Sequence, residues 1–174
     1  MSSLIVPEFV LLGSSPRVES ELFESMVAPL IVAGRVDGAY LEALVEREAT
    51  YPTGLPVPGG VAIPHAAPEH VLEDAIAIAI LDSPVKFREM GAPDQNFVDV
   101  HVVFMLALRG EHHLSLLQKV VKNVVDPGFV AALRGAPSAE AVVRMATSRF
   151  VTGSQAQDGP ASMPALSPRE GAAR

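Results

Sequence analysis

The chain has 174 residues, 49% of them hydrophobic, and this length and composition suit one domain with a single core. Its formal net charge of −7 at pH 7 argues against nucleic acid as a partner, and the absence of cysteine excludes a disulfide framework, a thiolate metal site and a cysteine nucleophile. No apolar run is long enough to span a bilayer, and the first residues lack the basic and then apolar pattern of a secretory leader, so we expect a cytoplasmic protein.

The first third of the chain predicts a strand followed by two helices. Residues 9–12 are apolar and run into a Gly-Ser-Ser-Pro turn, which indicates a short strand. From Ser20 the apolar positions recur at helical spacing, and Pro29 inside this pattern is expected to kink the helix or split it in two. Asp37 is a suitable N-cap for a second helix over 38–49.

The next segment leads to a histidine at the end of a strand. Residues 51–60 contain three prolines and three glycines and predict a shaped loop without regular structure. Residues 61–63 are apolar and predict a brief strand that ends at Pro64, which has no N–H to give to a ladder. His65 therefore follows a rigid strand on a loop, where we expect its imidazole to be exposed, and 66–70 form a second turn.

Two apolar segments predict the centre of a sheet. Residues 75–81 are continuously apolar and short, as is typical of a strand covered on both faces, and 84–87 continue as an edge-like piece. Residues 97–108 predict a second long strand. Helices before and after such strands favour an α/β layered fold.

The last third predicts three helical segments and a tail. Residues 113–124 have an amphipathic helical pattern, a shorter segment covers 128–133, and Ser138 is a suitable cap for the last helix. Ser, Pro, Gly, Ala and Gln then dominate without a periodic apolar face, which indicates disorder. We therefore expect one domain over 1–151 and a disordered tail over 152–174.

The five histidines do not form a metal-binding pattern. His65 and His70 are five apart across a proline turn, which is not a known ligand spacing. His112 and His113 are adjacent, so on a helix they point about 100° apart and cannot both face one ion. A P-loop and a nucleophile elbow are also absent from the sequence. A metal-dependent enzyme is therefore the last of the alternatives.

A single histidine can act alone as a nucleophile that carries a phosphoryl group. Neutral imidazole is a good nucleophile near pH 7, and phosphoryl transfer needs positioning and charge stabilisation. Arg47 and His113 are candidates for the cation and the second imidazole beside His65. Both also have structural interpretations, because Glu46 and Glu48 flank Arg47 as on a solvated helix face, and His113 could simply begin an apolar stripe.

Several motifs together resemble the type-2 enzyme IIA domains of the sugar phosphotransferase system. They are Arg47-Glu48, the Tyr-Pro-Thr-Gly-Leu run at 51–55 and the Gly-Val-Ala-Ile-Pro-His run at 60–65. The wording Pro-Thr-Gly-Leu, with His70-Val71 after the active loop, is most similar to the galactitol-specific branch. The resemblance covers about residues 5 to 148, and it includes further similar segments at 84–87, 104–107, 113–114 and 116–117.

This resemblance implies a single mixed β-sheet flanked by helices on both faces and a phosphocarrier function. In the family, a histidine accepts phosphate on Nε2 from Nδ1 of the phosphocarrier HPr and passes it to a cysteine of enzyme IIB, which serves the membrane enzyme IIC. The resemblance assigns the acceptor to His65, the second active-site histidine to His113, or to His112 next to it, and the cation to Arg47. It implies neither a metal nor another cofactor, gives no role to His70, and makes IIB a separate polypeptide, because this chain has no cysteine.

Other functions remain open from the sequence. The same residues would serve a regulatory enzyme IIA-like protein, such as the nitrogen-related enzyme IIA, whose phosphorylation state controls a partner. An inactive or structural homologue is a further alternative. The sugar is not specified by the sequence, because IIB and IIC select it in this system.

Overall fold

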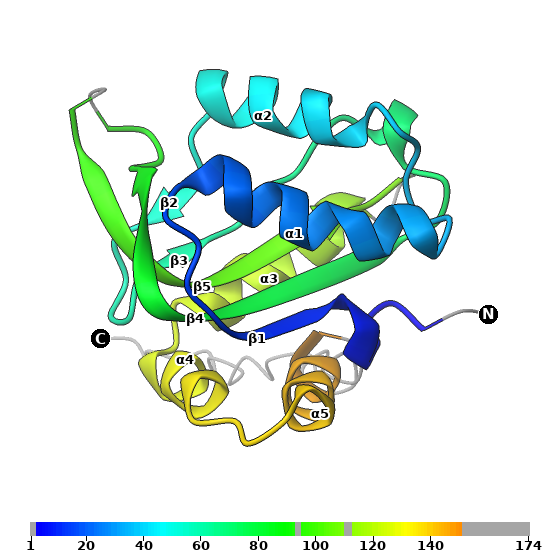
Figure 1. Cartoon of the computed structure of the whole chain (residues 1–174). Helices are drawn as coiled ribbons and strands as arrows, with labels where there is room; N and C mark the ends of the chain where they lie inside the picture. Colours follow the sequence, from blue (N-terminus) through cyan, green and yellow to red (C-terminus); the bar gives the residue numbers. More distant parts are fainter. Residues whose placement is uncertain (1–2, 93–94, 110–112, 151–174) are drawn as a thin grey trace, which may run out of the picture.

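A five-stranded mixed sheet forms the middle layer of the computed structural model, which describes residues 3–92, 95–109 and 113–150 (Figure 1). The strand order is β1-β4-β5-β3-β2. The pairs β1–β4 and β5–β3 are parallel, and the pairs β4–β5 and β3–β2 are antiparallel. The strands are β1 (Val10–Ser14), β2 (Gly54–Leu55), β3 (Val61–Ala62), β4 (Ala75–Arg88) and β5 (Phe97–Ala107).

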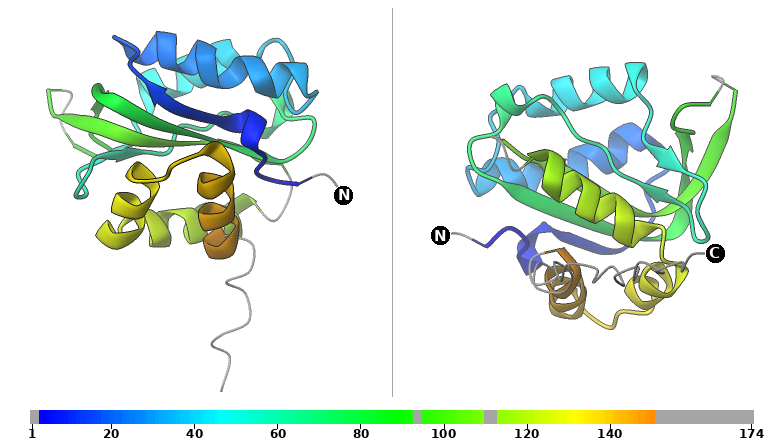
Figure 2. Two further views of the ribbon diagram at one scale, coloured as in Figure 1. Left: turned by 60° about the horizontal axis from the view of Figure 1, so that its bottom comes forward. Right: turned by 180° about the vertical axis from the view of Figure 1, so that it is seen from behind.

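Helices cover both faces of this sheet. Helices α1 and α2 pack on one face, and α3, α4 and α5 pack on the other (Figures 1 and 2). The predicted α/β fold with one mixed sheet between two helical layers is therefore confirmed. The helices are α1 (Glu19–Val32), α2 (Tyr40–Thr50), α3 (His113–Val124), α4 (Pro127–Arg134) and α5 (Ala139–Phe150), with short 3-10 turns at Pro7–Phe9 and Pro68–His70.

Strand β4 shows how the sequence divides the core between the two layers. Its first six residues alternate alanine and isoleucine, and successive side chains of a strand point to opposite faces. The alanines pack in the cluster under α1 and α2, whereas the isoleucines pack in the cluster under α3, α4 and α5. The small alanines leave room for α1 to lie close to β4.

The N-terminal elements differ in detail from the sequence prediction. The first strand starts at Val10, because Pro7–Phe9 form a 3-10 turn. Pro29 does not split α1, since it lies in the last turn, where its missing N–H removes only one intrahelical bond. The prediction of Asp37 as the N-cap of a helix over 38–49 was wrong, because α2 begins at Tyr40 with Ala39 at the N-cap; the Oδ1 of Asp37 instead accepts a hydrogen bond from the N–H of Ala39 at 2.9 Å in the turn before the helix.

Two predictions about the strands need correction. The segment 51–60 is not wholly irregular, because Gly54–Leu55 form strand β2 against β3. Residues 84–87 are not a separate edge piece, since β4 continues through them and pairs with β5 on both sides of an irregularity between Ile80 and Val85. The isolated sequence shows an interruption there, but it does not show that β5 continues to pair across it.

The three C-terminal helices confirm the predicted segments within one or two residues. The side-chain Oγ of Ser138 accepts a hydrogen bond from the N–H of Ala141 at 3.3 Å, as expected of a cap. The predicted tail over 152–174 lies outside the described residues. No helix in the described part of the chain is both long enough and apolar enough to cross a membrane.

Candidate functional site

His65 lies just beyond the end of strand β3, beside the C-terminal end of β5. Pro64 follows the strand, and the backbone of His65 pairs with Leu106 in an isolated parallel bridge. The N–H of Leu106 donates to the carbonyl of Pro64 at 2.9 Å. The residue is partly buried, so the expectation of an exposed imidazole was wrong. The reason is that β5 continues beside the chain after β3 has ended.

The two ring nitrogens of His65 have different partners. Nδ1 lies 2.9 Å from the backbone carbonyl of Ile63, and Nε2 lies 3.1 Å from Nη2 of Arg47. A carbonyl oxygen only accepts, and a guanidinium only donates. These partners therefore require the tautomer with the proton on Nδ1, and the lone pair of Nε2 points toward Arg47.

Arg47 reaches this ring from the last turn of α2. Its guanidinium carbon lies 5.4 Å from the centre of the Tyr51 ring, in a cation–π contact. Its Nε is buried and has no hydrogen-bond partner among the residues that the structure describes. The guanidinium thus contacts His65 through one N–H, and its Nε–H has no acceptor among the described residues.

The end of α2 is held by a buried carboxylate. Glu48 accepts hydrogen bonds from the N–H of Thr53 at 2.7 Å and from its hydroxyl at 2.8 Å. Burial raises the pKa of Glu48, and the bonds from Thr53 oppose that shift. Arg88 donates to the carbonyls of Glu48 and Ala49 and so satisfies the C-terminal end of the helix. The interpretation of Glu48 as part of a solvated face was wrong, whereas Glu46 is exposed.

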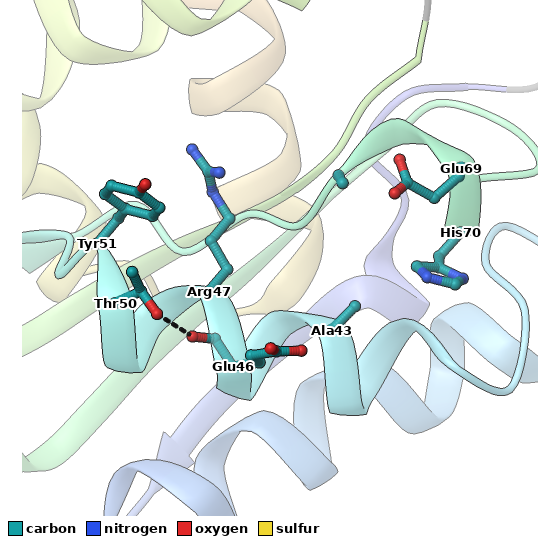
Figure 3. A pocket seen from close by; sticks show the side chains of 8 residues that line it. Ala43, Glu46, Arg47, Thr50, Tyr51, Glu69 and His70 are labelled. Carbon is teal, nitrogen blue, oxygen red and sulfur yellow. Dashed lines mark hydrogen bonds between the residues drawn. The ribbon is translucent and has the colours of Figure 1, made fainter.

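A cavity of about 300 Å³ lies between α2 and the segment that follows His65 (Figure 3). Arg47 and Tyr51 lie toward one end of it, and Glu69 and His70 toward the other. Nδ1 of His70 lies 3.1 Å from Oδ2 of Asp37, and this hydrogen bond is the largest cause that lowers the pKa of Asp37. This hydrogen bond links the 3-10 turn that follows His65 to the residues just before α2.

The other predicted histidines are less fully described. His113 is the first residue of α3, but its side chain and the whole of His112 lie outside the described residues. His101 is on β5, and its Nδ1 is buried without a hydrogen-bond partner in the described part of the chain. No group of three or more His, Cys, Asp or Glu among the described residues is arranged to hold a metal ion. The structure thus brings His65 and Arg47 together, while it adds Glu48 and Thr53 as residues that the sequence prediction missed.

The arrangement agrees with the comparison to known families. Residues 3–148 match the family model described as phosphoenolpyruvate-dependent sugar phosphotransferase system, EIIA 2. The chain belongs to this family. Proteins of the EIIA 2 family are phosphotransferase components that transfer a phosphoryl group through a phosphohistidine.

The chain is also similar to individual proteins and to solved structures. The chain is 31% identical over 148 residues to multiphosphoryl transfer protein 2 of Escherichia coli (strain K12), covering 82% of this chain but only 17% of that protein. It is 29% identical over 134 residues to the galactitol-specific EIIA component of the same strain, covering 76% of this chain and 88% of the relative. Among solved structures, nitrogen regulatory protein IIA-Ntr from Neisseria meningitidis superposes with a TM-score of 0.69 and 26% identity, covering 82% of this chain and 95% of that one.

Proposed function

We propose that this EIIA protein is a phosphocarrier of the phosphoenolpyruvate-dependent sugar phosphotransferase system, in which Nε2 of His65 accepts the phosphoryl group. The observation that carries the proposal is the pair of contacts on the imidazole. The Ile63 carbonyl holds the proton on Nδ1, and Arg47 lies 3.1 Å from Nε2. The nucleophilic nitrogen and a cation for the phosphoryl oxygens are thus adjacent before any partner binds.

The proposed reaction has two balanced steps. In the first, the lone pair of His65 Nε2 attacks the phosphorus of phospho-HPr, the new N–P bond forms, and the HPr imidazole leaves with the electron pair of the broken bond. In the second, the thiolate sulfur of a separate enzyme IIB attacks the same phosphorus and His65 leaves with its electron pair. IIB would then serve the membrane enzyme IIC, so the carrier would act in the cytoplasm.

Arg47 has to change partners during this reaction. Its Nη2–H points at the lone pair of Nε2 in the free protein, and the incoming phosphorus needs that lone pair. We expect the guanidinium to move its hydrogen bond from Nε2 to a phosphoryl oxygen, while the buried Nε–H without a partner in the described chain donates to a second oxygen. We propose His113 as the second active-site histidine, because it begins the helix α3 that follows β5.

The relatives support a proposal for the sugar branch and a second candidate role. The galactitol-specific component is similar over 88% of its length, which supports the galactitol branch as a description of ancestry. The similarity to IIA-Ntr at 26% identity and a TM-score of 0.69 supports a second candidate, a regulatory protein whose phosphorylation state controls a partner. In that case, the same His65 would carry the phosphoryl group, but no IIB would receive it.

Phosphorylation by purified components tests the proposal. The chain is incubated with phosphoenolpyruvate, enzyme I and HPr, and intact mass is recorded for the wild type and for His65→Ala. We expect the wild type to gain one acid-labile, base-stable phosphoryl group and the variant to gain none, with its far-UV circular dichroism unchanged. Phosphate on His65→Ala would overturn the assignment. Passage of the phosphate to a IIB cysteine distinguishes transport from the regulatory role.

A further inference from the structure

The hydroxyl of Tyr40 lies beside the backbone of β5, at the residue that bridges to His65. Tyr40 is the first residue of α2, it is fully buried, and 66 residues separate it from Leu106. Its hydroxyl donates to the carbonyl of Leu106 at 3.1 Å, and the nearby backbone of Ala66 opposes the rise that burial causes in the pKa of Tyr40. A buried hydroxyl of this kind stabilises the position of the carbonyl to which it donates, because no water takes its place when it is removed.

This bond supports the sheet bridge that carries His65. In a parallel pair, one residue bonds through both its N–H and its C=O to the residues on either side of its partner. Leu106 is that residue here, because it bridges to His65 and its N–H donates to the carbonyl of Pro64 at 2.9 Å. Its carbonyl, on the other side of His65, also accepts the hydrogen bond from the Tyr40 hydroxyl. Leu106 is therefore bonded both to the chain that carries His65 and to the start of α2.

We infer that Tyr40 is a positioning residue for phosphoryl transfer: its hydroxyl fixes the Leu106 carbonyl against the start of α2 and thereby sets where the bridge at Leu106 holds the His65 imidazole relative to that helix. The inference rests on the proposed function and assigns Tyr40 no contact with the phosphoryl group. The bond from Tyr40 to Leu106 also fixes Nε2 of His65 relative to Arg47, since Tyr40 and Arg47 belong to the same helix. One rigid element thus positions both the nucleophile and its cation.

Tyr40→Phe removes the hydroxyl oxygen and keeps the aromatic ring. The Leu106 carbonyl then loses its bond to α2, so the bridge that carries His65 shifts relative to Arg47. A displacement of the reacting atoms by about 1 Å can cost roughly 100-fold in rate. We therefore expect the kcat for phosphorylation by phospho-HPr to fall by roughly 10- to 100-fold. The KM for phospho-HPr should stay unchanged, because the buried hydroxyl does not contribute to the docking surface.

Phe23→Leu is the matched control. Phe23 is equally buried in the same layer, against Phe87 at a distance of 5.9 Å between ring centres. The control therefore also loosens the core, but it leaves the bond from Tyr40 to Leu106 and the bridge from Leu106 to His65 intact. We expect it to retain the wild-type kcat when assayed below its own unfolding midpoint. Equal rate losses in both variants would overturn the inference, as would a wild-type kcat in Tyr40→Phe or a Tyr40→Phe chain that does not fold while the control does.

A second readout does not depend on phosphorylation. Nitrogen-15 spectra report the shifts of the two His65 ring nitrogens, and amide hydrogen exchange reports the protection of the Ala66 N–H. In Tyr40→Phe we expect both to change, whereas in Phe23→Leu both should match the wild type. If the wild type accepts no phosphate, the proposed function fails, and these spectra still decide whether Tyr40 positions the ring.

Discussion

The layer of α1 and α2 and the layer of α3, α4 and α5 bury different kinds of side chain against the same sheet. Within the described residues, the three buried polar or charged side chains, Arg35, Glu48 and Thr53, all lie on the side of α1 and α2. On the other side, Phe104, Phe129 and Phe150 pack together with ring centres 5.6 to 6.4 Å apart. Both faces bury an apolar cluster, but within the described residues the side of α1 and α2 also accepts the cost of buried polar groups, which there position a reactive pair.

The aromatic side of this comparison predicts the largest loss of stability. Phe129→Ala removes a buried ring from the cluster of three and should lower the free energy of unfolding by about 3–5 kcal/mol. The rate of phosphoryl acceptance per folded molecule should remain that of the wild type, because the cluster does not contact His65 or Arg47. Denaturant unfolding gives the first value and the HPr-dependent assay at low temperature the second. A reduced rate in the folded variant would show that the two faces are not separable.

The polar side predicts a smaller loss of stability combined with a loss of rate. Glu48→Ala leaves the N–H and the hydroxyl of Thr53 without their buried acceptor, which should cost about 2–3 kcal/mol. It also frees the end of α2 that carries Arg47, so phosphoryl acceptance should slow by about tenfold. Glu46→Ala changes an exposed neighbour and is the control for both measurements. If the two variants behaved alike, the buried carboxylate would have no positioning role.

The smallest predicted effect is a pH dependence on the polar side. Burial and, secondly, repulsion by Glu48 raise the pKa of Glu19 from 4.5 to about 7, while Arg88 opposes the shift. The folded state therefore holds an extra proton between these two values, and its stability falls as the pH rises from about 4.5 to 7.

Glu19→Gln should remove this dependence. Because Glu19 is partly exposed and its charge is screened, we expect the variant to be more stable above pH 7 by only about 1–2 kcal/mol, with little change near pH 4.5. Thermal unfolding from pH 4 to 8 measures it, and Glu24→Gln on the exposed side of the same helix is the control. An unchanged pH profile in Glu19→Gln would show that other groups cause the dependence.

The sequence predicted elements with a strong local pattern and missed the contacts between them. Alternating alanine and isoleucine in β4 and the apolar periodicity of the helices are local features, and both elements were predicted correctly. His65 and Arg47 are 18 residues apart, and only the family resemblance, not their spacing, indicated that they meet. Whether His113 completes the pair stays a prediction.

The residues that hold the site were not predictable in the same way. Glu48 appeared solvated because its sequence neighbours are charged, yet Thr53 folds back over the end of α2 and buries it. The hydroxyl of Tyr40 finds its acceptor 66 residues away, and no periodic pattern contains such a pairing. Sequence patterns report which face of an element is apolar, but they do not report which buried polar group lies opposite.

The pairing of β3 with β5 has a consequence for how the protein is made. Strand β3 precedes its parallel neighbour by about forty positions, with Val61 opposite Val102 and His65 opposite Leu106. A ribosome-bound chain that ends before Phe97 lacks β5, so the strand that presents the imidazole can pair only with the short strand β2. Contacts of such long range form late in folding. The reactive histidine should thus be assembled only after most of the domain has been synthesised, so incomplete chains would not compete with the finished carrier for phosphate.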